Sequence, residues 1–210
     1  MHLPEGNVED IAQAVTDVAE CPDERRQDAG PPGPTPLKVV VDSASLITAA
    51  KVTVDGSTVV EHLAHYCLLR ITPAVHNEVI LAGAAYPDAA HVQALVTDGH
   101  ITVASPPVSA ASVLDGYKLG RGEKESIILA LTLPDTDYLL VDDRLAFVVS
   151  DRMTIPKILL VDLLVELVWK RFMERQLAEK MLGAMAPRYA PGFIPHTLTM
   201  LERGERRCLT

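Results

Sequence analysis

Two short apolar segments of this chain each end in aspartate, and they restrict what the chain can fold into. The segment LKVVVD covers residues 37–42 and ends at Asp42, and DYLLVDD covers residues 137–143 and ends at Asp142 and Asp143. A short run of apolar residues of this kind is typical of a strand that is buried on both faces. Functional side chains of a parallel sheet gather at the carboxyl ends of its strands, so these carboxylates predict a site there.

From Leu37 onward, strand-like segments alternate with segments of helical pattern. Besides the two strands above, we expect strands near residue 70 and at residues 100–107, where two prolines end the strand. Alternating strands and helices are typical of βαβ units, so the predicted fold class is α/β with a mostly parallel central sheet. The predicted helices cover residues 43–51, 59–68, 73–83, 84–99, 120–133, 144–153, 155–172 and 173–182, and a Pro-rich turn and a tail follow them.

Composition and charge narrow the class of protein further. Of the 210 residues, 48% are hydrophobic, which provides enough apolar side chains for a globular core. The formal net charge is −9, which argues against a protein that coats DNA with a basic surface. This charge is compatible with an enzyme that holds a few nucleotides next to a metal ion.

The cysteines and the apolar segments indicate where such a protein works. The three cysteines are widely spaced and contain no C-x-x-C pair, a pattern typical of a reduced intracellular protein. The N-terminus lacks a basic segment followed by an apolar run, so we expect no signal peptide. The most apolar segment, residues 155–169, is too short and too charged to span a bilayer. We therefore expect a cytoplasmic protein with no membrane partner.

The first 36 residues differ from the rest of the chain. Residues 8–20 have the pattern of a short amphipathic helix, and residues 21–36 read as a Pro-rich linker. This arm is either a disordered leader or a docking helix for a partner or a second subunit. The chain is therefore divided into an arm at 1–36, an α/β domain at 37–204 and a tail at 205–210.

Two glutamates are placed to join the aspartates at the strand ends. Glu78 lies within PAVHNEVI, and Glu123 lies in the first turn of the helix GEKESIILAL, with Glu125 as an alternative. A cluster of carboxylate oxygens is what hard Mg²⁺ or Mn²⁺ requires, and without a cation its members would repel one another. Each acid also has an ordinary structural interpretation: a helix cap for Asp42, a surface position for Glu78, a helix-dipole partner for Glu123, and a strand-to-helix turn for Asp142–Asp143.

Four pieces of the chain, taken in order, resemble the PIN-domain family, of the kind found in VapC-type toxins and their relatives. They are VVVDSASLITAAK, RITPAVHNEVI, LGRGEKESIILALTL and YLLVDDRLAF, and the resemblance runs from about Lys38 to Gly204. The later pieces, with the tail KILLVDLLVELVWKR and the segment RYAPGFIP, are most similar to a prokaryotic subgroup of nucleic-acid-binding proteins. The resemblance implies a three-layer α/β/α sandwich around a parallel sheet. It also implies a metal-dependent ribonuclease.

The resemblance further implies which acidic residues form the site. The acidic quartet would be Asp42, Glu78, Glu123 and Asp142, with Asp143 as a further ligand of Mg²⁺ or Mn²⁺. In this interpretation Asp42 and either Asp142 or Asp143 hold the ion. Glu78 and Glu123 complete its shell or orient the attacking water.

Other residues take supporting roles by the same resemblance. Ser45 sits where a hydroxyl residue of the family assists the metal or the phosphate, and Arg144 or Lys124 could steady a phosphate. The chain departs from the family pattern at Phe147, near a position where relatives often have an arginine. The expected partners are an RNA substrate, a small antitoxin protein that blocks the acidic cleft, and a second copy in a homodimer.

Two other classes of function stay open from the sequence alone. One is a PIN-like domain that binds nucleic acid or a protein without cutting. The other is a receiver or phosphatase, but DSASL lacks the second aspartate of the D-x-D phosphatases, and the acidic pair follows the later strand rather than the first. A zinc site at His62 and His65 would lack a second pair of ligands.

Overall fold

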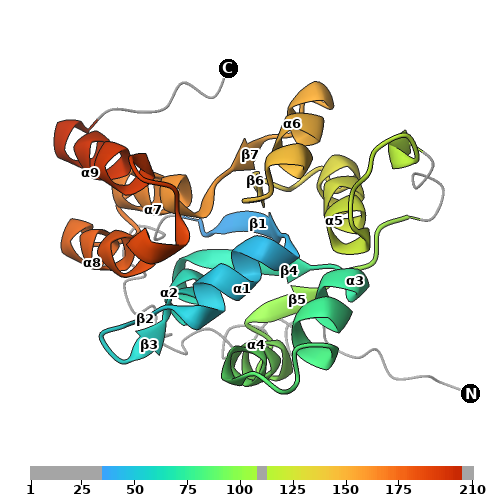
Figure 1. Ribbon diagram of the computed structural model, residues 1–210, viewed down its shortest axis with the longest axis horizontal. Coiled ribbons are helices and arrows are strands. Elements are labelled where there is room, and N and C mark those ends of the chain that lie inside the picture. Colours follow the sequence, from blue (N-terminus) through green and yellow to red (C-terminus); the bar gives the residue numbers. More distant parts are fainter. Residues whose placement is uncertain (1–34, 108–112, 205–210) are drawn as a thin grey trace, which may run out of the picture. The chain divides into compact units, whose positions relative to one another are not determined.

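A computed structural model describes residues 35–107 and 113–204 of the chain. Their centre is a five-stranded sheet in the order β5-β4-β1-β6-β7, in which every neighbouring pair of strands is parallel. Figure 1 shows helices on both sides of this sheet. The predicted α/β class is therefore confirmed. The strands are β1 (Leu37–Val41), β4 (Cys67–Ile71), β5 (Ile101–Val103), β6 (Tyr138–Leu140) and β7 (Lys157–Ile158).

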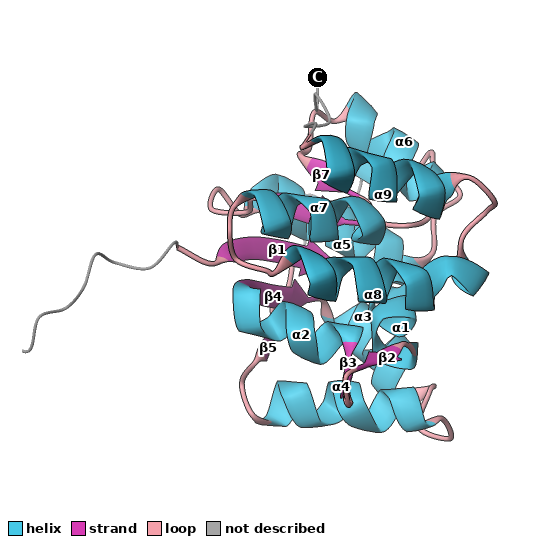
Figure 2. Cartoon of the chain, turned by 90° about the vertical axis from the view of Figure 1, so that its left-hand side faces the viewer, coloured by secondary structure: helices cyan, strands magenta, loops and turns pink. Residues whose placement is uncertain are grey.

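Two separate cores hold the helices against the sheet. The larger core contains apolar residues of α1 (Ser43–Lys51), α2 (Val59–Tyr66), α3 (Pro73–His76), α4 (Pro87–Thr97), α7 (Leu160–Trp169), α8 (Arg175–Met185) and α9 (Phe193–Arg203). The smaller core contains those of α5 (Arg121–Thr132) and α6 (Arg144–Arg152). Within the larger layer, α7, α8 and α9 pack on one another (Figure 2).

The residues of β1 alternate between these two cores. Val39 and Val41 belong to the larger core, and Val40 between them belongs to the smaller one. Successive side chains of a strand point to opposite faces, so a strand covered by helices on both sides must be apolar throughout. This explains the uninterrupted valines of β1, and it confirms the sandwich of helices, sheet and helices.

Several predicted element boundaries are wrong. Cys67 and Leu68 belong to β4 rather than to the preceding helix, which ends at Tyr66. The expected helix at 73–83 is α3 followed by a π-helical turn, η2 (Asn77–Leu81), which carries Glu78. The expected strand at 100–107 is reduced to the three residues of β5.

The C-terminal part contains two further corrections. Residues 157–158 form strand β7 rather than the start of a helix, because Ile158 pairs with Leu140 at the edge of the sheet. The expected turn and tail contain the short helix η4 (Ala186–Arg188) and then α9. Gly192 precedes α9 and Gly204 ends it, both with a positive φ that glycine adopts readily.

The structure does not describe the two ends of the chain. The helix expected at residues 8–20 and the tail at 205–210 lie outside the described residues, as does nearly all of the arm at 1–36. Among the helices that are described, none is long and apolar enough to cross a membrane.

Candidate active site at the carboxyl ends of the strands

The sheet places two of the predicted acids beside each other. The order of the strands reverses at β1, because β4 and β5 lie on one side of it and β6 and β7 on the other. Asp42 follows β1, and its backbone N–H donates to the Leu140 carbonyl of β6 at 3.1 Å. Asp142 follows two residues after Leu140. Both carboxylates therefore stand where parallel sheets generally form their binding crevices.

Asp42 is the most buried of the predicted acids, with 1% of its surface exposed. Its Oδ1 accepts a hydrogen bond from the Ser45 backbone N–H at 2.8 Å and thereby caps α1. Its Oδ2 is buried and has no hydrogen-bond partner in the described part of the chain, and the same holds for the Ser45 hydroxyl. The capping interpretation is thus correct for one oxygen of Asp42 and leaves the other unexplained.

The surroundings of Asp42 disfavour its negative charge. Burial raises the pKa of Asp42 to about 7, and the charges of Asp142 and Glu123 add to the rise. The Ser45 hydroxyl, which lies beside the carboxylate without forming a hydrogen bond of good geometry, and the Ser45 backbone N–H oppose the rise. The two charge contributions mean that Asp142 and Glu123 are close enough to Asp42 to repel it. An isolated buried carboxylate with an unpaired oxygen is costly, and sites of this kind are concentrated at functional positions.

Asp142 is held by two donors from the C-terminal part of the domain. The Leu160 backbone N–H donates to Oδ1 at 3.1 Å, and the Tyr189 hydroxyl donates to Oδ2 at 2.7 Å. Burial raises the pKa of Asp142, and these two hydrogen bonds lower it. Asp143 has a different role, because its Oδ1 accepts from the Ala146 N–H at 2.8 Å and caps α6. The two adjacent aspartates are therefore distinguishable, and Asp142 is the one beside Asp42.

Glu78 reaches the same region from η2. The Ser43 hydroxyl, next to Asp42 in the chain, donates to Glu78 Oε2. Gly122 of α5 packs against this pair: a Cβ at Gly122 would lie 2.5 Å from Glu78 Oε2 and 2.7 Å from Ser43 Oγ. A larger residue at Gly122 would displace the Glu78 and Ser43 side chains, and in the present arrangement α5 brings Glu78 next to the turn that carries Glu123.

Glu123 and Glu125 make different contacts. Glu123 Oε2 accepts from the Gly120 backbone N–H at 2.7 Å at the start of α5. Glu125 accepts from the Ala74 N–H at 3.0 Å and from Arg121 Nε at 2.8 Å, so it ties α5 to the start of α3. Of these two alternatives, Glu123 is the one whose charge acts on Asp42.

The donor chemistry of this cluster fits a divalent cation. All the groups are carboxylate or hydroxyl oxygens, and the buried Oδ2 of Asp42 lacks a partner, as expected for a ligand of Mg²⁺ or Mn²⁺. Among the described residues, no three side chains of aspartate, glutamate, histidine or cysteine lie close enough together to hold a metal ion as they stand. Binding would require Glu78 and Glu123 to exchange their bonds with Ser43 and Gly120 for bonds to the cation.

Sequence reasoning did not assign three residues of this site. Tyr189 lies in the RYAPGFIP segment, 47 positions from Asp142, and nothing local links the two. Ser43 and Gly122 were also not assigned, although each is adjacent to a predicted acid. The one local sign of this site is Gly122, which precedes Glu123 in the first turn of α5 and lies against the Ser43 and Glu78 side chains.

The fold and this cluster define a class of protein: a parallel α/β sandwich with acidic side chains collected where the strand order reverses. A protein-family model described as DUF3368, a PIN domain, matches residues 38–207. The chain therefore belongs to the PIN-domain family, and the resemblance inferred from the sequence is confirmed at this level. No curated protein and no solved structure matches the chain significantly. PIN domains are generally nucleases and typically use divalent metal ions, so nuclease chemistry on nucleic acid is the class of activity that this family indicates.

Proposed function

We propose that the protein is a metal-dependent endoribonuclease that hydrolyses RNA phosphodiester bonds at the cluster of Asp42, Glu78, Glu123 and Asp142. The observation that carries this proposal is the buried Oδ2 of Asp42, which has no hydrogen-bond partner among the described residues, together with the charges of Asp142 and Glu123 that act on Asp42. A fold that needed Asp42 only as a helix cap could use serine or asparagine without this electrostatic cost. Membership of the PIN-domain family supports the same assignment.

The proposed division of labour follows from the contacts of each residue. Asp42 and Asp142 would hold Mg²⁺ or Mn²⁺, and the ion would supply an activated water and stabilise negative charge at phosphorus. Tyr189 keeps Asp142 oriented, and because burial raises the pKa of its hydroxyl, Tyr189 stays a hydrogen-bond donor at all working pH values. Ser43 holds the Glu78 carboxylate at the edge of the cluster. Asp143 stays with α6 and is not part of the proposed shell.

We further propose two protein partners for this chain. The VapC-type resemblance suggests the toxin of a toxin–antitoxin pair, whose antitoxin would cover the acidic cleft, and a homodimer. The supporting observation is the exposed apolar surface of α6 near the cluster, at Leu145 and Val148. If a small open reading frame adjoins the gene, co-expression of the two chains followed by copurification tests the antitoxin directly.

The first test of activity is cleavage of a labelled single-stranded RNA by the purified chain in Mg²⁺, in Mn²⁺ and in EDTA. We expect cleavage with either ion, none in EDTA, and none by an Asp42→Asn/Asp142→Asn variant purified in the same way. Cleavage that persists in the variant would assign the activity to a contaminant or to another site. Calorimetric titration of Mn²⁺ gives a second readout that does not depend on finding the right RNA.

A binding module without catalysis is the rival function, and one observation favours it. Glu123, Asp142 and Glu78 all have hydrogen-bond partners within the protein, so the cluster is partly satisfied without an ion. Under this rival, the chain would bind RNA or a protein, take up no Mn²⁺ in calorimetry and cut no RNA. Uptake of Mn²⁺ that is lost in the double variant would exclude it.

A further inference from the structure

A pocket adjoins the acidic cluster, and it is lined by basic and aromatic side chains as well as by Asp142. It has a volume of about 490 Å³ and is lined by residues of α1, α6 and the segment between α8 and α9. This volume lies within the range of about 300–1,000 Å³ that small-molecule sites occupy. Asp142 lines the hollow as well, so the pocket and the cluster share one carboxylate. A ligand in the pocket would therefore lie beside the proposed reaction centre.

Two arginines flank this pocket without acidic partners. Arg144 begins α6, and Arg188 ends η4, and both side chains are exposed. Across residues 35–107 and 113–204, neither guanidinium forms an ion pair, and Arg188 makes only a long 3.4 Å contact to the Thr48 hydroxyl. Three other arginines are paired, Arg70 with Asp135, Arg121 with Glu125 and Arg175 with Glu179, whereas Arg152 and Arg171 also form no ion pair within the described residues but do not line the pocket. Guanidinium groups left open at a pocket are suited to a phosphate, which they can bind through two parallel hydrogen bonds.

The walls of the pocket between these arginines are aromatic. Phe147, Tyr189 and Phe193 all line it, and the chain contains only three phenylalanines in total. The Tyr189 and Phe193 ring centroids are 6.3 Å apart with an interplanar angle of 41°. Phe193 is 44% exposed although it is large and apolar. Aromatic faces next to cationic groups are the elements that bind single-stranded nucleic acid through base stacking and phosphate contacts.

We infer that this pocket holds one nucleotide of the RNA strand next to the phosphate that is cut, with its base on Phe193 and Phe147 and its phosphate on Arg144 and Arg188. The inference rests on the proposed ribonuclease function and adds to it a recognition subsite. Tyr189 connects the two parts, because its ring lines the pocket while its hydroxyl holds Asp142. Binding of a nucleotide against this ring would thus be sensed directly by a proposed metal ligand.

A nucleotide fits these side chains better than an apolar protein segment does. A helix docked on Phe193 would leave both guanidinium groups without a counter-charge unless it supplied acidic residues at both positions. A nucleotide provides a planar base and an anion within one unit, as the pocket requires. Because the whole chain carries a net charge of −9, two arginines without acidic partners reduce locally the repulsion that an RNA strand meets.

The test measures steady-state cleavage and binding of the same fluorescein-labelled single-stranded RNA. Arg188→Gln and Phe193→Ala are the test variants, and both positions are exposed, so the fold should tolerate them. Binding is measured by fluorescence anisotropy in an Asp42→Asn background, in which no cleavage is expected. Two variants serve as matched controls. Arg152→Gln removes an arginine at the C-terminal end of α6, at the opposite end of that helix from Arg144, and Tyr86→Ala removes an exposed aromatic ring elsewhere.

We expect Phe193→Ala to raise KM and the dissociation constant by about 5- to 100-fold, the range found when a stacking residue is removed. Arg188→Gln should raise both by about 10- to 100-fold, because a hydrogen bond to a charged group is lost. The change in kcat should be much smaller. Arg188→Gln should also reduce the slope of log K against log salt by about 0.7, because one phosphate contact is lost. With an RNA that lacks the one base expected to stack on Phe193, the Phe193→Ala variant and the parent protein should have the same KM and dissociation constant. The control variants should match the parent protein.

The outcomes separate this inference from the proposed function. If the parent protein cleaves RNA with metal dependence while both test variants retain its KM, affinity and salt slope, the pocket is not a nucleotide subsite and the ribonuclease assignment stands. If the variants lose a copurifying antitoxin but bind RNA normally, the pocket is a protein site and the inference is wrong. If the parent neither cleaves nor binds RNA, both proposals fail together.

Discussion

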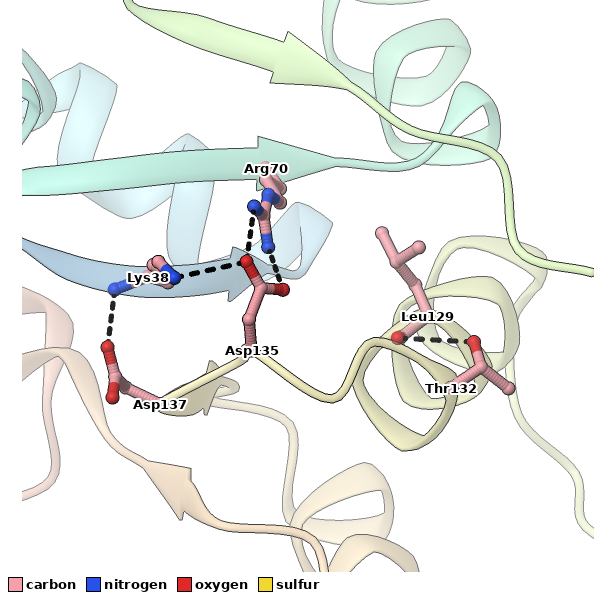
Figure 3. A network of polar contacts seen from close by, with 6 residues as sticks. All are labelled: Lys38, Arg70, Leu129, Thr132, Asp135 and Asp137. Atoms are coloured by element: carbon pink, nitrogen blue, oxygen red, sulfur yellow. Dashed lines mark hydrogen bonds and ion pairs between the residues drawn. The ribbon is translucent and has the colours of Figure 1, made fainter.

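Two groups of charged side chains lie near the two ends of β1, and they are built in opposite ways. Near its start, Asp135 lies between Lys38 and Arg70, with Nζ–Oδ2 and Nη1–Oδ1 distances of 3.2 and 2.9 Å (Figure 3). Asp137 accepts from the Lys38 backbone N–H at 2.7 Å. After its end, Asp42 faces two other acids and has a buried oxygen without a donor. The charge of Lys38 is balanced by acids from the segment before β6, and Arg70 of β4, which lies opposite Val40, shares Asp135 with it, whereas the acids after the end of β1 have no such cationic partner among the described residues.

The difference appears in the proton affinities of the two groups. Hydrogen bonds from Arg70 and Lys38 lower the pKa of Asp135, whereas burial raises the pKa of Asp42 to about 7. The first arrangement needs nothing more, because each charge already has a partner. The second costs stability within the isolated chain, and a fold keeps such a cost where a bound ion or substrate offsets it.

The largest expected effect comes from removing the charge at Asp42. A rise in pKa from 3.8 to about 7 corresponds to roughly 4 kcal/mol of destabilisation above pH 7, at 1.36 kcal/mol per pH unit. Because the pKa is higher in the folded state, this cost is absent below pH 4 and grows as the pH rises from 4 to 7. In EDTA, Asp42→Asn should therefore be more stable than the parent at pH 8 and nearly equal to it at pH 4. Urea unfolding at both pH values measures this.

A matched control variant separates the effect of the buried Asp42 charge from that of a change in net charge. Asp143→Asn removes an aspartate from the same end of the sheet but keeps an oxygen that can cap α6 at Ala146. Its unfolding free energy in EDTA should differ from that of the parent by a small amount that is similar at the two pH values. A gain at pH 8 as large as that of Asp42→Asn would mean that net charge, and not the burial of Asp42, is responsible.

A divalent ion should stabilise only the uncompensated end of β1. Mn²⁺ at a hundred times its dissociation constant would add about 2.7 kcal/mol to the free energy of unfolding by mass action. The melting temperature of the parent protein should rise by several degrees, and that of Asp42→Asn should not change. An Asp135→Asn variant should respond as the parent does, because Asp135 belongs to the other group. An equal rise in all three proteins would indicate unspecific binding of the ion.

A smaller effect is expected from Tyr189→Phe, which removes one hydroxyl and keeps the ring. The Asp142 Oδ2 loses its donor, and a lost hydrogen bond to a charged group costs about 1.5–3 kcal/mol. That bond lowers the pKa of Asp142, so its loss should move the acid limb of the cleavage–pH profile to higher pH. Tyr86→Phe, at an exposed tyrosine away from the acids, is the control and should leave the profile in place.

The architecture was predictable because the two central strands with uninterrupted apolar runs can be recognised from their local sequence. The unbroken apolar runs of β1 and β6 required helices on both faces, and the two cores confirm this. The hairpin of β2 (Thr53–Val54) and β3 (Ser57–Thr58) was missed although its turn, Asp55–Gly56, has the positive φ values that Asp-Gly favours. Strand β7 was missed for a different reason. Its two residues are extended only because Leu139 and Leu140 lie beside them, which no local pattern reports.

The candidate site was predictable in part, for a physical reason. Asp42 directly follows β1 and Asp142 comes two residues after the end of β6, so the pairing of these two parallel strands brings them together. The position of Glu123 relative to Asp42 depends on how closely α5 approaches, and Gly122 leaves room there for the side chains of Ser43 and Glu78. Tyr189 and Arg188 come from the segment between α8 and α9, and the contact of Tyr189 with Asp142 joins positions 47 residues apart. Such long-range placements follow from tertiary packing and leave no periodic trace in the sequence.

The smallest expected effect is at the compensated end of β1, and it has the opposite sign. Asp135→Asn leaves Lys38 and Arg70 without their shared carboxylate, so the variant should be slightly less stable than the parent at pH 7. The pKa of Asp135 is lower in the folded state, so its contribution is present above the ordinary value of 3.8 and fades as the pH falls below it. The difference between the two proteins should therefore shrink on acidification and in high salt, since the pair is exposed. Urea unfolding at pH 7 and pH 3, at low and high salt, measures it. If Asp135→Asn instead gained stability at pH 7, both ends of β1 would carry uncompensated charge, and the contrast that points to Asp42 would be lost.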